Sequence, residues 1–256
     1  MTEREETAKK RAELIKKKKR RRRRFIFVFF LIIMLAFGSV ASFTFLFPIK
    51  SVSASGSKLY TESAIVKSSK LMGKNLFTVS EEDLLVTLNH DLPYIDSVTL
   101  KRSFPDKIIL KVKDAKPYAS YHIDNKYYKV SRKGNVLEYD YTLPENTFEI
   151  ICPDVICKVG QAAEFKSKET KELINSLISS LEKNEIKINK IDVSNTSEIK
   201  FFVDGRFDVL LGSKTNYENK IAQLGAMIKN IESDKKGTIN LSIWNESGRQ
   251  TSFIPS

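Results

Sequence analysis

Apolar residues along this chain form one long uninterrupted run, followed by many short periodic ones. Phe25 to Phe47 contains no charged residue. As a helix this run would be about 34 Å long, enough to cross a hydrocarbon core of about 30 Å. The apolar character continues past every small residue until Pro48, which excludes the short core of a cleavable signal peptide. We therefore expect residues 25–47 to form an uncleaved transmembrane helix.

Between residues 48 and 116 the pattern predicts the element order β-α-α-β-β. A short strand is expected at 49–54 and a short helix at 61–66. The residues from Ser80 to Asp83 form a capping box, which opens a second helix that reaches residue 91. Two alternating runs then predict strands at 94–102 and 107–114. We expect both helices to pack on one sheet.

From residue 117 to residue 256 the pattern predicts a β-rich domain with two or more helices. A meander is expected first, and an apolar stripe then predicts a helix over 168–183. Asp204-Gly205 indicates a two-residue hairpin turn, and a capping box at 215–218 opens another helix. The last predicted strands are 238–244 and 250–254. The fold class is therefore α+β, with one N-terminal transmembrane helix.

The charge is concentrated in the first 24 residues. They hold thirteen Lys or Arg and four Glu, a net charge of +9, whereas the whole chain carries +12, so residues 25–256 carry only +3. Cationic flanks stay in the cytoplasm during membrane insertion. We expect a cytoplasmic tail (1–24) that also contacts anionic membrane lipid, with the C-terminus outside the membrane. The near-neutral remainder argues against a nucleic-acid partner.

Residues with catalytic or metal-binding chemistry are sparse. The two histidines, His90 and His122, fall in different predicted domains, and no HExxH, GxSxG or P-loop pattern is present. We predict no enzyme activity, no cofactor and no metal. Cys152 and Cys157 both lie outside the membrane in this topology and are a candidate disulfide; the sequence leaves open whether they are bonded or reduced.

Several short motifs, in this order after a single anchor, resemble the bacterial cell-division family FtsQ/DivIB. Residues 73–77 read GKNLF and fit that family's turn between the two helices of its POTRA domain. Pro93-x-Ile95-x-x-Val98 and Arg102-x-x-Pro105 fit its second and third strands. The resemblance implies a POTRA domain at 48–116 and an FtsQ/DivIB-type β domain at 117–256. Residues 237–241 stand where the family has G-x-I-D-L, with Asn240 in place of the aspartate.

The resemblance also implies a function. It predicts a non-enzymatic scaffold of the divisome, anchored in the cell membrane at the septum and helping to coordinate septal wall synthesis. Its partners would be the coiled-coil division proteins FtsB (or DivIC) and FtsL, together with other divisome membrane proteins. A β domain that ends in a strand with an open edge can accept a partner's strand. By position, the resemblance assigns this contact to Leu241, Ile243, Trp244, Ser252 and Phe253.

Two other classes remain as alternatives. A POTRA-containing export component would bind envelope substrates, although such proteins usually carry repeated POTRA units or a membrane barrel. A membrane-bound wall enzyme would need the catalytic motifs that this sequence lacks.

Overall fold

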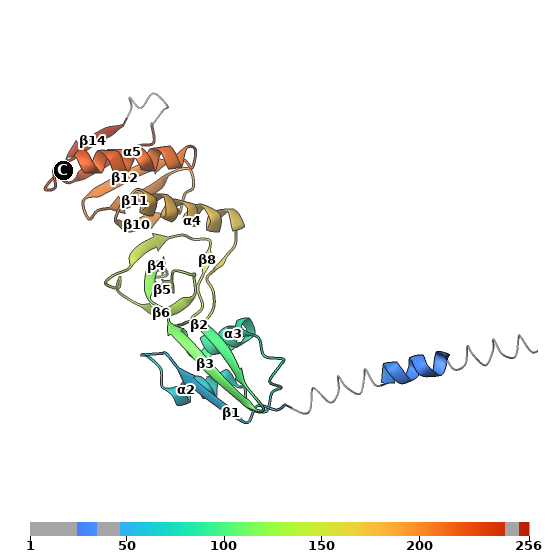
Figure 1. Cartoon of the computed structure of the whole chain (residues 1–256). Coiled ribbons are helices and arrows are strands. Elements are labelled where there is room, and N and C mark those ends of the chain that lie inside the picture. The colour runs from blue at the N-terminus through green and yellow to red at the C-terminus, as the bar shows by residue number, and fades with distance from the viewer. Residues whose placement is uncertain (1–24, 35–46, 244–250, 256) are drawn as a thin grey trace, which may run out of the picture. The chain divides into compact units, whose positions relative to one another are not determined.

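The computed structural model describes residues 25–34, 47–243 and 251–255 (Figure 1). Residues 25–34 are helical, and their side chains are exposed. Among the described residues, no helix combines the length and the apolar character needed to cross a membrane. The predicted cytoplasmic tail and residues 35–46 of the predicted transmembrane helix lie outside the described residues.

The predicted order β-α-α-β-β is confirmed after residue 47. Its elements are β1 (Ser51–Ser55), α2 (Glu62–Ser69), α3 (Glu81–Asp91), β2 (Ile95–Ser103) and β3 (Lys107–Asp114). The sheet has the order β1-β3-β2. The Ser80 hydroxyl accepts a hydrogen bond from the Asp83 amide at 3.1 Å and caps α3 as predicted. The shorter helix α2 extends to Ser69 and ends where Lys70 adopts a left-handed conformation.

A nine-stranded sheet, in the order β14-β13-β12-β11-β10-β7-β4-β5-β6, forms most of the remaining fold. Parallel pairs join β4 to β7, β7 to β10 and β12 to β13, and the remaining neighbours are antiparallel. The strands are β4 (Pro117–Ile123), β5 (Lys126–Ser131), β6 (Val136–Asp140), β7 (Phe148–Ile151), β10 (Ile188–Asp192), β11 (Ile199–Val203), β12 (Phe207–Gly212), β13 (Gly237–Asn240) and β14 (Ser252–Pro255). Strands β8 (Val155–Ile156) and β9 (Glu164–Phe165) form a separate pair.

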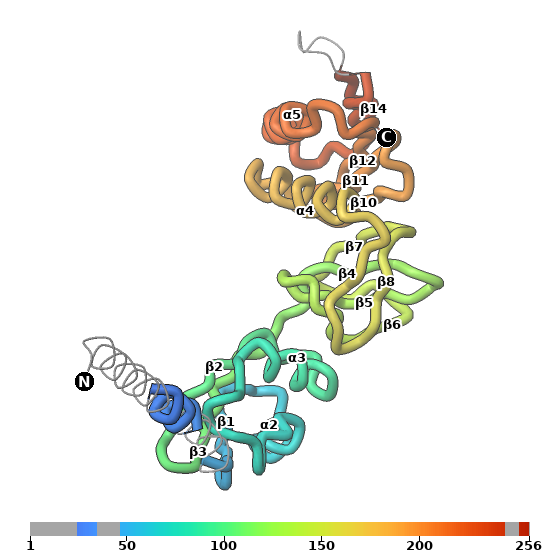
Figure 2. The backbone as a smooth tube through the Cα atoms, turned by 90° about the vertical axis from the view of Figure 1, so that its right-hand side faces the viewer, coloured from blue at the N-terminus to red at the C-terminus, as the bar shows by residue number. Residues whose placement is uncertain are grey.

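Two helices, α4 (Lys168–Lys183) and α5 (Tyr217–Asn230), lie on the same side of strands β10–β12 (Figure 2). Helix α4 has the predicted bounds and buries its apolar stripe against the sheet. The predicted capping box of α5 is wrong: Asn216 at the cap has φ +54° and makes no side-chain capping bond. The predicted two-residue hairpin turn is also wrong. Val203 pairs with Phe207, so the loop has three residues.

The chain divides into two compact units. The first consists of Met1–Val52, Leu71–Val79 and Arg102–Ile108, and the second of Ser53–Lys70, Ser80–Lys101 and Ile109–Ser256. The second unit contains the core of the nine-stranded sheet, to which β10–β13 and helices α4 and α5 contribute fully buried aliphatic side chains and two phenylalanines. This core supports the strands that end at β14.

Candidate functional site

The last strand, β14, lies at one edge of the nine-stranded sheet, and no strand of the described residues lies beyond it. It pairs with β13 in an antiparallel register that places Asn240 opposite Ser252, Ile239 opposite Phe253 and Thr238 opposite Ile254. This register fixes which backbone groups of β14 are already bonded and which face outward.

Hydrogen bonds between β13 and β12 show in which direction the backbone groups of β13 point. The amides of Gly237 and Leu241 donate to the Arg206 and Leu210 carbonyls of the β12 segment at 3.2 and 2.8 Å. Backbone groups alternate in direction along a strand, so Thr238 and Asn240 face β14. Ser252 and Ile254 therefore bond inward to β13, and the N–H and C=O of Phe253 face the open edge.

The side chains of β14 alternate in the same way. The Phe253 ring is half-buried and meets the buried Phe207 edge to face, with ring centroids 6.0 Å apart. The Ile254 side chain is 61% exposed. A Cβ at Gly237 would overlap the Ile254 carbonyl, so a glycine here allows β13 and β14 to approach. Packing on the core thus holds β14 while its outer backbone stays accessible.

The opposite edge strand, β6, is chemically different. It carries Glu138 and Asp140, and the Lys129 amine of β5 lies near both carboxylates. Charged side chains on an edge strand disfavour pairing with another chain. Strand β14 has the sequence SFIP and carries no charge, although Pro255 removes one amide at its end. Of the two edges, β14 is therefore the better template for an added strand.

The residues that the family resemblance assigned to partner contact fall in different environments. Leu241 is fully buried, and Ile243 is 51% exposed. Ser252 and Phe253 are half-buried on β14. Trp244 lies outside the described residues. The structure thus places Ser252 and Phe253 at the open edge, while Leu241 belongs to the core beneath it.

Asn240 bonds within the turn after β13 and Lys220 bonds to the end of β12, and the sequence analysis gave neither of them a structural role. The Asn240 side-chain oxygen accepts bonds from the amide and hydroxyl of Ser242 at 2.9 and 2.7 Å. An amide oxygen thus closes the turn after β13 without a carboxylate. The buried Lys220 amine donates to the Leu211 carbonyl at 2.9 Å, and burial lowers its pKa. The sequence does not reveal the role of Lys220, because a lysine among the polar residues of an amphipathic helix is expected to face solvent.

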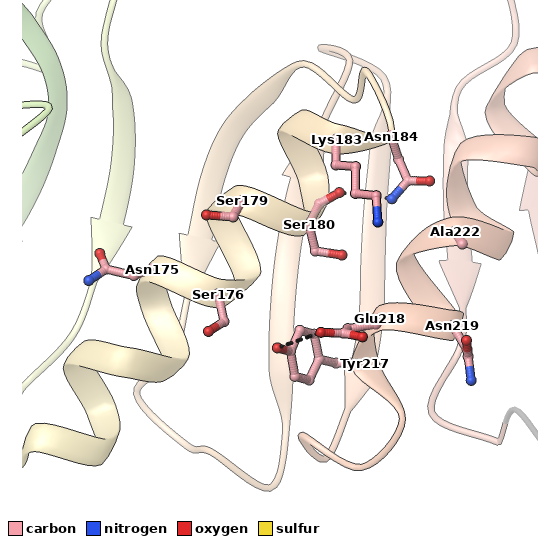
Figure 3. A pocket seen from close by; sticks show the side chains of 10 residues that line it. All are labelled: Asn175, Ser176, Ser179, Ser180, Lys183, Asn184, Tyr217, Glu218, Asn219 and Ala222. Carbon is pink, nitrogen blue, oxygen red and sulfur yellow. Dashed lines mark hydrogen bonds between the residues drawn. The ribbon is translucent and has the colours of Figure 1, made fainter.

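A polar groove of about 540 Å³ lies between α4 and α5 (Figure 3). Serine, asparagine and tyrosine side chains dominate its lining, and the Tyr217 hydroxyl donates to Glu218 at 3.4 Å. Glu218 is the only acid of this lining and Lys183 its only cation. The groove offers hydrogen-bonding groups, and its composition does not favour acid–base chemistry.

The histidines and cysteines do not assemble into a common site. The His122 ring lies 2.8 Å from the Glu149 carboxylate, which also pairs with Lys190 at 3.1 Å. Within the described ranges, no group of three or more His, Cys, Asp or Glu could hold a metal ion. Cys152 and Cys157 are free thiols, and burial raises the pKa of both, that of Cys157 to about 12. Their pairing as a disulfide stays a prediction.

Comparison with known proteins gives matches along most of the chain. The family model described as "POTRA domain, FtsQ-type" matches residues 47–114. The model described as "Cell division protein FtsQ/DivIB, C-terminal" matches residues 119–242.

Individual relatives agree with these family matches. The chain is 27% identical to the cell division protein DivIB of Clostridium acetobutylicum over 203 residues, which are 77% of this chain and 80% of that protein. It is 25% identical to DivIB of Clostridium tetani over 210 residues, 77% of this chain and 76% of the relative. It is 26% identical to the cell division protein FtsQ of Koribacter versatilis over 147 residues, 56% and 42% of the two chains.

Proposed function

Because the chain belongs to the FtsQ/DivIB family of cell division proteins, we propose that it is a bitopic membrane scaffold of the divisome. In this proposal residues 25–47 cross the cell membrane with residues 1–24 in the cytoplasm. A POTRA domain (48–116) and a β domain (117–256) lie outside. The +9 charge of the tail beside an uncharged run supports this orientation.

The open edge of β14 is the observation that carries the proposed activity. Its Phe253 backbone groups face outward, its side chains are uncharged, and Phe253 holds it to the core through Phe207. An added strand would gain affinity from main-chain hydrogen bonds and register from side-chain contacts. We infer that the incoming strand belongs to an FtsB- or DivIC-like coiled-coil protein, paired with an FtsL-like protein.

A scaffold of this kind performs no chemistry and needs no cofactor. Its contribution would be to hold the coiled-coil pair and other divisome membrane proteins at the septum, where wall synthesis is coordinated. The family relationship supports a role in division, and the edge supports the mode of binding. The protein would act by bringing partners together. Each variant should therefore be tested for which partner it no longer binds.

Site-specific photo-crosslinking tests the proposal in cells. A photoreactive amino acid replaces Ile254, whose exposed side chain lies on the edge strand. The matched control replaces Val86 on α3, which is 73% exposed. We expect light-dependent adducts with an FtsB- or DivIC-like protein from position 254 and none from position 86. Equal adducts from both positions, or none from 254 in dividing cells, would reject β14 as the binding edge.

A further inference from the structure

Three phenylalanine rings form a partly exposed cluster in the first compact unit. Phe47, Phe77 and Phe104 come from three separate segments, with ring centroids 5.3, 6.3 and 5.6 Å apart in the pairs 47–77, 47–104 and 77–104. Phe77 is 44% exposed and Phe104 is 63% exposed. Exposed apolar patches on a protein surface mark sites that bind other proteins or membranes.

Local hydrogen bonds hold the segments that carry these rings together. The Leu76 amide donates to the Phe47 carbonyl at 2.9 Å, and the Ile49 amide donates to the Lys74 carbonyl at 2.8 Å. The guanidinium of Arg102 donates to the carbonyls of Leu76 and Val79 at 2.8 and 2.7 Å. The Phe77 segment is therefore tied on one side to Phe47 and on the other to the segment that carries Phe104.

Each ring has an exposed lysine three residues away in the sequence: Lys50 after Phe47, Lys74 before Phe77 and Lys107 after Phe104. The described residues of this unit contain four cations, these three and Arg102, against the single acid Asp106, a net charge of +3. An exposed apolar cluster on a unit of net positive charge matches the boundary between headgroups and acyl chains of an anionic bilayer.

Phe47 is also the last residue of the uncharged run Phe25 to Phe47. If that run spans the membrane, as proposed above, the chain leaves the bilayer at the cluster itself. We propose that Phe47, Phe77 and Phe104 insert into the outer lipid interface and fix the first unit against the membrane surface. This inference rests on the proposed anchor, but it is independent of strand capture at β14.

Depth-dependent quenching tests the inference in the full chain. The native Trp244 is replaced by phenylalanine, and Phe104→Trp supplies a single indole reporter. The chain is reconstituted into vesicles of phosphatidylethanolamine and phosphatidylglycerol that carry brominated acyl chains. We expect bromines near the headgroup end to quench the reporter more strongly than bromines near the methyl end. A Val86→Trp reporter on α3, in the second unit, is the comparison.

A second variant separates insertion from simple tethering next to the membrane. Adding Phe77→Gln to the Phe104→Trp chain should lower the quenching, because the neighbouring ring no longer enters the interface. Adding Val86→Gln to that chain should leave the quenching unchanged. A Phe104→Trp reporter that is quenched no more than Val86→Trp, or quenching that Phe77→Gln does not alter, would overturn the inference.

Two further readouts keep this inference distinct from the proposed function. A chain that is removed from vesicles by a carbonate wash contradicts the anchor and, with it, lipid insertion of the cluster. A chain that resists the wash but shows no quenching overturns the aromatic contact alone. The Phe77→Gln, Phe104→Gln double variant, with Trp244 intact, should still capture the coiled-coil partner.

Discussion

Proline at position 253 isolates the outward-facing amide of β14. Phe253→Ala and Phe253→Pro both remove the aromatic ring, and only the second also removes the N–H that faces the open edge. Proline is tolerated on an edge strand where its nitrogen faces away from the sheet, and the native Pro255 has the same parity as residue 253. The alanine variant is therefore the matched control.

The two variants should have similar stability. A fully buried Phe→Ala change costs about 3–5 kcal/mol, and the half-buried Phe253 should cost both variants roughly half of that. Proline adds no loss of a native hydrogen bond at this position. By contrast, Ser252→Pro removes an inward amide opposite Asn240 and should lower the melting temperature further.

Partner binding should separate the variants. Losing one interchain hydrogen bond costs about 0.5–1.5 kcal/mol, and the proline ring also obstructs the approaching strand. A total near 1.4 kcal/mol corresponds to an affinity about ten-fold lower for Phe253→Pro than for Phe253→Ala.

The assay titrates purified full-length chain in detergent with the coiled-coil partner pair, and thermal melting is recorded in parallel. Equal affinities for the alanine and proline variants would show that the outward amide makes no bond to the partner. Weaker binding by Phe253→Pro that only follows a lower melting temperature would assign the strand a structural role instead.

Three other experiments test the supporting structure. Gly237→Ala places a Cβ against the Ile254 carbonyl and should weaken partner binding about ten-fold in the same titration; unchanged affinity would contradict the close approach of β13 and β14. Burial lowers the folded pKa of Lys220 below its ordinary 10.5, so the unfolded chain binds more protons between the two values and stability rises with pH there. In chemical denaturation, Lys220→Met should flatten this rise, and equal slopes would refute the assignment. Burial raises the pKa of Cys152 and Cys157, so the folded reduced chain should react with iodoacetamide at neutral pH much more slowly than the unfolded chain; equal rates would contradict the burial.

Sequence patterns predicted correctly those elements whose helix or strand signal lies entirely within the element and its flanking residues. Helix α4 runs over Lys168–Lys183 as predicted, because a continuous apolar stripe follows a serine cap at Ser167. Strand β3 has the predicted bounds because Ile108, Leu110 and Val112 share one face and Lys111 and Lys113 lie on the other. Where the hydrophobic periodicity, the capping residue and the turn residues all indicate the same element, tertiary contacts do not shift its bounds.

Strands β7 and β10 were not predicted, and their environment explains why. They pair in parallel near the centre of the sheet, where a short strand does not need to alternate apolar and polar residues. The predicted strand at 238–244 ends early because Asn240 turns the chain. The sequence indicated an open final strand, whereas the outward direction of Phe253 depends on hydrogen bonds between β12 and β13 that no local pattern encodes.

Amide-resolved hydrogen exchange of β14 tests strand capture most directly. The full chain is measured alone and with a saturating amount of the coiled-coil partner pair. The inward amides of Ser252 and Ile254 should already be protected, whereas the Phe253 amide should exchange fast alone and at least about ten-fold more slowly in the complex. Unchanged exchange at Phe253 while the partner is bound would contradict capture of a strand at this edge.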